Sequence, residues 1–467
     1  MFRRTLFFLS KTDRWSERVI KLGFAFLWLL TNQLAYGQST VLENYVQQGL
    51  QSNLALKKEG LHIEKSLKAL EEARGLFKPQ VSFQASYTLA WGGRTIDFPI
   101  GDLLNPVYGS LNQLSGTDQF PMIANESIQF LPHKFHETKF RVIQPLFNTD
   151  IYYGYKAQQE LVSVQQAKQK TYEKELIKEI KTAYYQYLQT HKVTTIYEDT
   201  KTLLEEILRV NKSLVANDKA TNEVIYGAEY EISKIDQELV HAHKNKELAK
   251  AYFNFLLNRD LQEEIELDEQ LIAALAIAEV DLNEMESEAL KQRDEFDQLQ
   301  SAVNAQEQLI MMHKRKAMPS LALVGDLGYQ GFGYKFDNTQ DFALVQFSLT
   351  WDIYKGGQNK TTYQKAQLDK SILENQYDEL KNQIRLQVKE KYYAYDAAKQ
   401  VIATSNAALK SAERNYNITK RKHKEGVIPS FQLLDTQTKY TNARLALVIA
   451  QYDLLIKKTA LERAVGL

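Results

Sequence analysis

Two stretches of the chain alternate between apolar and polar residues. Apolar side chains occupy every second position over residues 81–91, and the same pattern returns over residues 343–353. A period of two puts such side chains on one face of a β-strand. Weaker alternation close to each stretch supplies a partner strand. The pattern therefore predicts one strand pair within residues 81–147 and another within residues 320–353.

The remaining apolar residues follow a helical rhythm. Over residues 196–214 and 225–256 they recur at alternating spacings of three and four, which is typical of a coiled-coil seam. The turn-forming segment 217–222 separates the two seams. We therefore expect a hairpin of long helices over residues 151–257 and a second hairpin over residues 357–464. A helix of ~65 residues would extend roughly 100 Å at about 1.5 Å per residue, so each hairpin should be a rod.

Proline and glycine support this division of the chain. The chain has 467 residues and 8 prolines, and no proline occurs between residues 146 and 318. A proline inside a helix costs roughly 3 kcal/mol or more, so this tract favours long helices. Four of the prolines fall in the segment 97–138, which we expect to be a long loop between the first two strands.

The two halves of the chain repeat each other. Residues 50–79 align with residues 290–319, and the tyrosine-rich segment 183–187 aligns with residues 391–395. The second separation is shorter because the first half carries extra residues in the loop after its first strand. Each repeat should hold a helix, a strand pair and a coiled-coil hairpin. The expected parts are a first repeat at 38–257, a linker at 258–283 and a second repeat at 284–467.

Residues 1–37 are typical of a secretory signal peptide. Basic residues are followed by the apolar run 22–30 and by a small-x-small cleavage pattern at residues 35–37. The apolar run is shorter than the ~20 residues that span a bilayer, which favours cleavage over an N-terminal anchor. The chain contains no cysteine, so we expect no lipid attached through a thioether.

Composition and charge exclude several classes of function. The 58 basic residues equal the 58 acidic residues, so the chain lacks the overall positive field of nucleic-acid-binding proteins. Without cysteine it has no disulfide and no thiolate metal site. His241 and His243 would point to different faces of a helix, which argues against a metal site there. No catalytic or nucleotide-binding motif stands out, and we expect neither an enzyme nor a bound cofactor.

The predicted strands leave two interpretations open. A two-stranded hairpin is only marginally stable alone, so the strands either pack as soluble hairpins or pool with other copies into a closed barrel. An export signal and apolar strand faces favour the barrel. The smallest transmembrane barrels have about eight strands, so two or three chains would be needed. The competing function is an exported periplasmic coiled-coil adaptor or scaffold without a channel.

Three motifs of the chain carry a resemblance to a known family. They are Leu-Asn-Arg-Asp-Leu at 257–261, Ala-Leu-Lys-Gln-Arg-Asp-Glu-Phe at 289–296, and Gly-Val-Ile-Pro-Ser-Phe-Gln-Leu-Leu-Asp at 426–435. In this order and spacing they resemble the TolC-type outer membrane efflux protein family, over residues 41–464. The resemblance implies a mainly α fold with a β-barrel part. Three copies would form one 12-stranded outer-membrane barrel, continued by a long coiled-coil α-barrel.

The resemblance also implies a function and a location. Such a protein is the passive exit duct of a tripartite efflux pump or of a type I secretion system. Its partners are two further copies of itself, a periplasmic adaptor protein, an inner-membrane transporter and the lipid of the outer membrane, but no nucleic acid. The barrel would lie in the cell outer membrane and the helical part in the periplasm.

The resemblance further implies a constriction at the periplasmic tip. Asp435 matches the aspartate that rings the closed end in the family, and Gln432 stands where some members have a second aspartate. Ile428 stands where those members have a gating arginine, so that network should be absent here. Three aspartates around a narrow axis would repel one another and attract cations.

Two further sets of residues are candidate contact sites. The tip turns are expected to dock the adaptor through Asn217, Asp218, Gly426 and Pro429. Aromatic side chains near the strand ends should sit at the membrane interface, as in the girdles of transmembrane barrels. These are Tyr87, Trp91 and Trp351.

Overall fold

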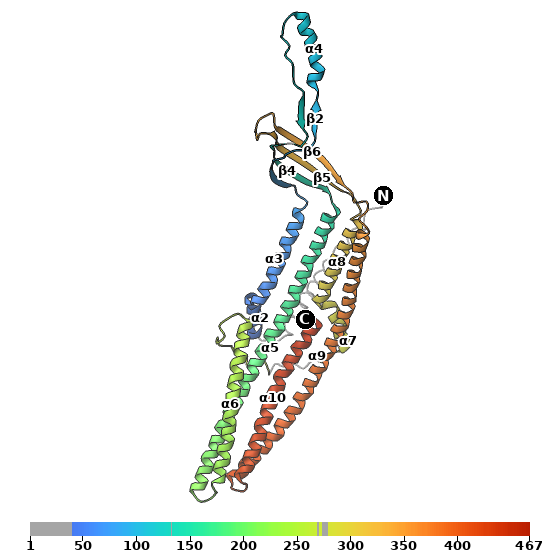
Figure 1. Cartoon of the computed structure of the whole chain (residues 1–467). Helices are drawn as coiled ribbons and strands as arrows, with labels where there is room; N and C mark the ends of the chain where they lie inside the picture. Colours follow the sequence, from blue (N-terminus) through green and yellow to red (C-terminus); the bar gives the residue numbers. More distant parts are fainter. Residues whose placement is uncertain (1–39, 132, 269, 273–278) are drawn as a thin grey trace, which may run out of the picture. The chain divides into compact units, whose positions relative to one another are not determined.

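The structure is a computed structural model that describes residues 40–131, 133–268, 270–272 and 279–467 (Figure 1). The predicted signal peptide lies outside these residues. The described residues fall into two compact units. The helical unit comprises residues 40–63, 165–299 and 375–467, and the strand unit comprises residues 64–164 and 300–374. Each unit draws on both halves of the sequence, so the compact units are not the sequence repeats.

Long helices dominate the described chain. Four of them contribute to both units: α3 (Leu54–Gly75), α5 (Thr149–Ala216), α8 (Asp294–Arg315) and α9 (Gln358–Lys424). Four others lie in the helical unit: α2 (Thr40–Ser52), α6 (Glu223–Leu256), α7 (Leu282–Gln292) and α10 (Ser430–Val465). The two longest, α5 and α9, have 68 and 67 residues. Among the described helices, none combines the length and the apolar character needed to cross a membrane.

Burial in the helical unit follows the predicted seams. Every seam position of α6 from Ile225 to Leu256 is buried or half-buried, whereas Tyr226 and Tyr230 between them are exposed. One cluster of buried residues joins the hairpins and contains Leu204, Ile207, Tyr416, Leu433 and Leu434. The seams therefore hold the two coiled-coil hairpins together within this unit.

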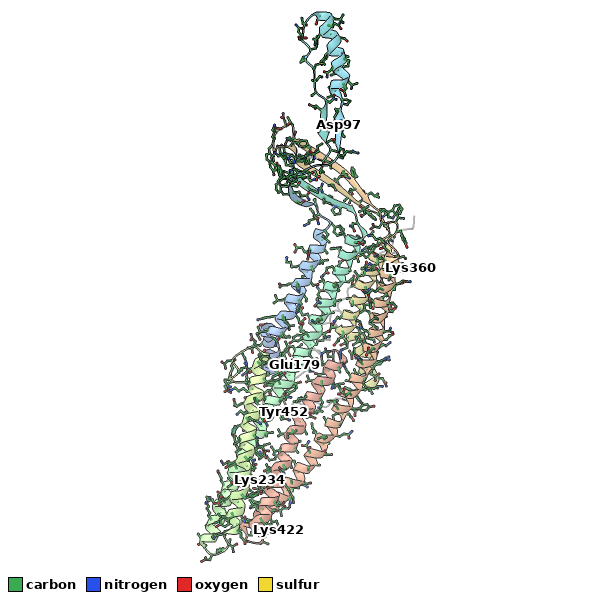
Figure 2. The ribbon with its side chains drawn as sticks, in the orientation of Figure 1. Asp97, Glu179, Lys234, Lys360, Lys422 and Tyr452 are labelled. Atoms are coloured by element: carbon green, nitrogen blue, oxygen red, sulfur yellow. The ribbon has the colours of Figure 1, made fainter. Side chains whose placement is uncertain are left out.

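The largest core cluster of the helical unit surrounds Tyr184, Phe253 and Tyr452. Figure 2 labels Tyr452. The segment after α6 packs onto it through Ile265. The Tyr184 hydroxyl donates to the Glu266 carbonyl at 2.9 Å, and burial raises the pKa of that hydroxyl. The described part of the predicted linker therefore packs against the core and is hydrogen-bonded to it.

Both halves of the chain interrupt a helix at aligned positions. Asn53 separates α2 from α3, and Arg293 separates α7 from α8. Asn53 Nδ2 donates to the carbonyl oxygen of Leu256 at 2.8 Å, and Arg293 Nη1 donates to that of Ala464 at 3.0 Å. These carbonyls lie at aligned positions near the ends of α6 and α10. Each interruption therefore secures the end of a coiled-coil hairpin in the same way.

Other aligned residues also occupy equivalent buried places. Leu176 and Ile180 in α5 are fully buried, as are their counterparts Ile384 and Val388 in α9. Gly49 packs so closely that a Cβ atom at this position would collide with the Ile180 side chain. A larger residue here would displace the end of the Ile180 side chain, so the close approach of α2 to α5 favours glycine.

One antiparallel sheet forms the centre of the strand unit. It consists of β1 (Gln80–Thr88), β4 (Phe135–Phe147), β5 (Ser320–Phe332) and β6 (Asp341–Thr350), in the order β1-β4-β5-β6. The central β4–β5 pairing joins the two halves of the sequence. Among the described residues, β1 and β6 each pair with a single strand of the sheet, so both edges are open.

The segment 97–138 is not the plain loop expected from the sequence. It contains helix α4 (Ile100–Ser115), and β2 (Thr95–Phe98) pairs with β3 (Glu126–Gln129). Pro106 lies inside α4 and does not prevent its formation. The prediction of a loop from the prolines was therefore wrong. The apolar residues of α4 recur with helical spacing, which favours a helix despite Pro106.

Asparagine side chains hold the returning chain against α4. Asn105 donates to the Ile123 carbonyl at 2.9 Å and accepts from the Ile123 N–H at 2.8 Å. Asn112 exchanges the same pair of hydrogen bonds with Phe120 at 2.8 and 3.0 Å. These side-chain amides give the backbone N–H and C=O groups of an irregular segment the hydrogen-bond partners that a neighbouring strand would give. They supply the partners that a loop of this length needs.

Candidate functional site

The two predicted tip turns lie in the helical unit and share one backbone geometry. Asp218 has φ of 57° and Gly426 has φ of 73°, so both are left-handed. Each donates its N–H to the carbonyl three residues back, and the next residue donates to the carbonyl five residues back. This Schellman arrangement ends both α5 and α9. Aligned positions of the two halves therefore perform the same structural task with different residues.

Pro429 and Asn217 flank the two turns. Pro429 precedes α10 in an extended conformation, with φ of −75° and ψ of 155°. Asn217, the first residue after α5, donates its Nδ2 to the Ser213 carbonyl of α5 at 2.7 Å. All four predicted docking residues therefore lie in or beside the turns. Figure 2 marks Lys422, whose carbonyl accepts the N–H of Val427 in the second turn.

A buried asparagine that the sequence analysis missed connects the two turns. Asn211 of α5 is fully buried. Its Nδ2 donates to the Val224 carbonyl and to Ser430 Oγ, both at 2.9 Å, and the Ser430 hydroxyl lies 3.2 Å from Asn211 Oδ1. Asn211 thereby joins α5 to the first turns of α6 and α10. No pattern in the sequence marks it, because its partners lie on other helices.

Asp435 and Gln432 both lie on the exposed face of α10. The neighbouring Leu433 and Leu434 are buried against the other hairpin. Asp435 Oδ2 lies 2.7 Å from Lys439 Nζ, and the Asp435 side chain is 55% exposed. Within one chain the carboxylate therefore faces solvent and is partly neutralised. Any ring of these residues must involve further copies of the chain.

Large apolar side chains are exposed beside the tip turns. Tyr226 and Tyr230 in α6, Val427 in the second turn and Phe431 in α10 are each at least 65% exposed. Tyr226 and Tyr230 lie four residues apart, as do Val427 and Phe431, and neighbouring exposed apolar side chains mark interaction surfaces more often than isolated ones do. The exposure of these four side chains could not be predicted from the sequence, because it depends on how the helices pack.

The strand-unit sheet has one apolar and one mostly polar face. Residues paired across neighbouring strands share a face, as Phe83, Phe140 and Leu327 do. What we call the apolar face is strongly exposed and contains Val81, Phe83, Phe140, Val142, Leu327, Val345 and Phe347. The opposite face is the polar face.

An ion cluster occupies the polar face. Arg141 lies directly opposite Asp326 in the β4–β5 register. Its Nε and Nη2 donate to the two Asp326 oxygens at 2.8 and 2.6 Å. Lys139 Nζ lies 2.6 Å from Glu137 and 3.3 Å from Asp326. The cluster holds two positive and two negative groups and therefore has no net charge.

The predicted interface aromatics lie near opposite ends of the sheet. Tyr87 pairs in register with His136 at the start of β4, and its ring lies 5.7 Å from that of Tyr334. Trp351 follows β6 at the other end, where its Nε1 donates to the Ala317 carbonyl at 2.9 Å. Trp91 follows β1 and is 77% exposed. The structure thus brings Tyr87 and Trp91 toward one end and Trp351 to the other.

A second ionic group lies in the helical unit at the α7–α8 interruption. Glu295 accepts from Arg293 and from Arg463, with distances of 2.9 Å. Burial raises the pKa of Glu295, but the hydrogen bonds from the two arginines outweigh burial and lower the pKa to about 2. The carboxylate is therefore held in its charged form.

The histidines show no metal-binding arrangement. His243 Nε2 lies 3.9 Å from Glu198 Oε1, and both side chains are exposed. In the part of the chain that the structure describes, no three His, Cys, Asp or Glu side chains gather as metal ligands would.

Comparison with known proteins gives a family match for residues 286–467 and a fold for most of the chain. Residues 286–467 match the family model for outer membrane efflux proteins, and no curated protein matches the chain. The outer-membrane channel OprN is 15% identical, with a TM-score of 0.72, over 91% of this chain and 90% of OprN. The Campylobacter jejuni CmeC outer membrane channel is 15% identical, with a TM-score of 0.71, over 91% and 86%. The open state of the Neisseria gonorrhoeae MtrE outer membrane channel is 16% identical, with a TM-score of 0.72, over 91% and 89%.

At these identities the similarity to the solved structures shows the fold alone. The match to the family model covers the second half of the chain and is independent of that similarity. Together they confirm the TolC-type resemblance drawn from the sequence.

Proposed function

We propose that three copies of the chain form a passive outer-membrane channel, because residues 286–467 match the family model for outer membrane efflux proteins and the fold is that of solved outer-membrane channels. The observation that carries the proposal is the open four-stranded sheet with an exposed apolar face. Open edges invite pairing with another chain, and four strands are too few to close alone. Three copies would supply twelve strands and remove every edge.

The two faces of the sheet suit such a barrel. The apolar face would contact lipid, with Tyr87, Trp91 and Trp351 near its two ends as interfacial aromatics. The polar face would line the lumen. Its ion cluster around Asp326 is neutral, so the barrel part would offer a hydrophilic passage with little charge preference.

The helical unit would supply the periplasmic part. There the tip turns containing Asn217, Asp218, Gly426 and Pro429 would dock a periplasmic adaptor, which in turn would connect the channel to an inner-membrane transporter. The exposed side chains of Tyr226 and Phe431 support a docking role, because an adaptor would remove their apolar surface from water. The assembly would be a tripartite efflux pump or a type I secretion system.

We place the constriction of this channel at Asp435 and Gln432. Three Asp435 carboxylates around the axis would favour cations, although Lys439 would weaken the effect. Replacing Asp435 with Ala should reduce cation selectivity in planar bilayers. Asp453→Ala is the matched control, because Asp453 forms the same type of exposed ion pair with Lys457 in the same helix. Equal selectivity of the D435A variant and the unaltered protein would contradict this assignment.

The membrane insertion of the sheet can be tested with two adjacent residues of β6. Val345 lies on the apolar face and Gln346 on the polar face. A lysine facing lipid costs about 2–4 kcal/mol near the bilayer centre, so Val345→Lys should deplete the heat-sensitive trimer from outer-membrane extracts. Gln346→Lys should leave it in place.

The same fractionation separates the channel from the competing function. A passive channel acts by providing a path, so no catalytic role is proposed. Recovery of both lysine variants and of the unaltered protein as soluble periplasmic species would contradict the channel. It would instead support an exported coiled-coil scaffold.

A further inference from the structure

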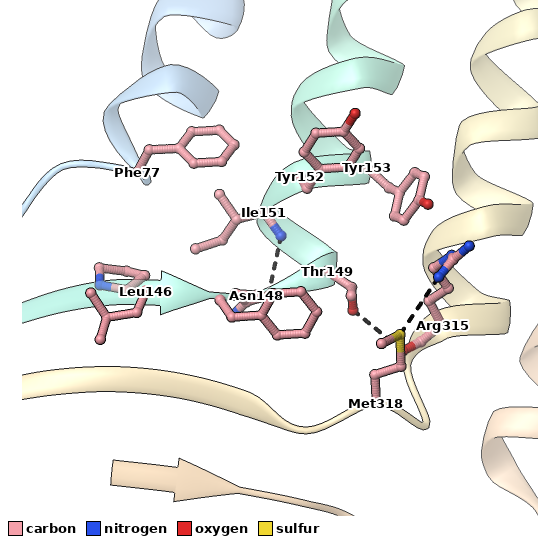
Figure 3. A pocket seen from close by; sticks show the side chains of 11 residues that line it. Phe77, Leu146, Asn148, Thr149, Ile151, Tyr152, Tyr153, Arg315 and Met318 are labelled. Carbon is pink, nitrogen blue, oxygen red and sulfur yellow. Dashed lines mark hydrogen bonds between the residues drawn. The ribbon is translucent and has the colours of Figure 1, made fainter. Parts of the chain in front are cut away.

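A hollow lies in the strand unit where the sheet meets its helices (Figure 3). Its volume is about 360 Å³. Three chain connections form its walls: the end of α3 with Phe77, the passage from β4 into α5, and the passage from α8 into β5 with Arg315 and Met318. All of these residues belong to the strand unit, so the hollow is built within one compact unit.

A β-bulge turns the wall of the hollow toward the apolar face. The β4–β5 register shifts between Pro145 and Phe147, leaving Leu146 as the extra residue. Phe147 then pairs with Leu321, which pairs with Leu349 on the apolar face. Leu146 and Phe147 are both more than 40% exposed. The hollow therefore lies where the apolar face ends, with an exposed apolar wall.

The Arg315 side chain places a positive charge at the opposite wall. Arg315 Nη1 contacts Met318 Sδ at 3.8 Å, which is a weak interaction for a guanidinium group. The adjacent Lys316 is 3.6 Å from Asp150. Among the described residues no carboxylate forms an ion pair with Arg315. The hollow thus combines apolar surface with a positive charge whose donors are available.

The remaining polar groups hold the walls in place. Thr149 Oγ1 donates to the Arg315 carbonyl at 3.4 Å, linking the start of α5 to the end of α8. Asn148 Oδ1 accepts from the N–H groups of Asp150 and Ile151 at 2.9 and 3.2 Å. The Tyr152 and Tyr153 rings lie 5.0 Å apart in an edge-on arrangement. Figure 3 shows these tyrosines at the start of α5, facing the space between the connections.

We propose that this hollow binds a membrane phospholipid, with the lipid phosphate on Arg315 and an acyl chain on Leu146 and Phe147. The proposal rests on the proposed function, since it requires the apolar face to lie in the membrane. A planar guanidinium binds a phosphate through two parallel hydrogen bonds. The volume suits a headgroup and the start of an acyl chain, and the rest of the chain continues along the apolar face. Tyrosine side chains favour this boundary, because the ring is apolar and the hydroxyl is polar.

Native mass spectrometry of the detergent-purified full chain tests the proposal. The probes are dioleoylphosphatidylethanolamine, dioleoylglycerol with the same acyl chains but no phosphate, and inorganic phosphate. We expect the phospholipid to bind to the unaltered protein. The affinity for the phospholipid should fall roughly tenfold in Arg315→Gln, the expected effect of losing one charge-assisted hydrogen bond. The affinity should partly recover in Arg315→Lys. Lys314→Gln is the control, because Lys314 is an exposed neighbour that does not line the hollow.

Each outcome has a defined meaning. Dioleoylglycerol should bind equally to the unaltered protein and to Arg315→Gln. Equal phospholipid affinity of those two proteins overturns the proposal, and so does full displacement of the lipid by inorganic phosphate, which would indicate an anion site. The same spectra report whether three copies assemble. Because the hollow lies within one chain, Arg315-dependent lipid binding to a monomer would support the hollow while counting against the trimeric channel.

Discussion

The contact made by Asn211 gives the sharpest prediction about the tip. Its side chain is the buried polar link between α5, the start of α6 and the start of α10. Asn211→Ala removes the two donations from Nδ2 and the acceptor of the Ser430 hydroxyl. The Ser430 side chain, only 4% exposed, then loses its partner without gaining water. The start of α10 should therefore separate from α5 more often.

The size of the effect follows from the number of bonds lost. A typical intramolecular hydrogen bond contributes about 0.5–1.5 kcal/mol, and a buried group left without a partner costs about 1–3 kcal/mol. Two lost bonds and one unpaired hydroxyl add to about 2–6 kcal/mol. Since about 1.4 kcal/mol is tenfold, local opening should increase by roughly 30-fold or more.

Hydrogen–deuterium exchange measures this opening directly. Peptides covering the start of α10, residues 430–437, should lose protection in Asn211→Ala, while peptides of the sheet should not change. Asn217→Ala is the matched control, because Asn217 is exposed and its side chain bonds to the Ser213 carbonyl of α5 and not to another helix. If the two variants exchange alike at the start of α10, Asn211 does not join the hairpins as argued.

Three other predictions concern the sheet, the turns and the ionic group. Gly328→Ala should abolish the proposed trimer because a Cβ there would overlap the β4 backbone, whereas Gly325→Ala, with its nearest atom 3.9 Å away, should be tolerated. Gly426→Ala should lower thermal stability, measured by circular dichroism, by about 1 kcal/mol, and Asp218→Gly should not, because both positions are left-handed. The pKa of Glu295 is lowered from 4.5 to about 2, so its stabilisation is complete above pH 4.5 and is lost as the pH falls toward 2. That contribution is about 3 kcal/mol, and Glu295→Gln should flatten the acid dependence of unfolding in this range.

Periodicity made the strands and the coiled-coil seams predictable. It reports which face of a local element is buried, and that requires no knowledge of distant residues. The seam of α6 and the alternation after Pro79 are of this kind. The two tip turns were also visible, because turn-forming residues interrupt otherwise continuous helical patterns.

Contacts between distant segments could not be predicted from the sequence. The pairing of Arg141 with Asp326 depends on the β4–β5 register, which joins strands from different halves of the chain. Asn211 is one polar residue among many in α5 until α6 and α10 pack against it. Helix α4 was not predicted because the segment 97–138 contains four prolines, one of which, Pro106, lies inside the helix.

The duplication also shows where the two halves have diverged in chemistry while keeping one backbone plan. At the first helix interruption Asn53 holds the Leu256 carbonyl with a neutral amide, and Ala55 follows it without a charge. At the second, Arg293 holds the equivalent carbonyl with a guanidinium group and recruits Glu295. A neutral hydrogen bond does not titrate between pH 4.5 and 2, whereas the ionic group does. Acid should therefore destabilise the second interruption, and its amides should exchange faster as the pH falls toward 2. The first interruption should keep its protection from hydrogen exchange, so two structurally equivalent interruptions should respond differently to pH.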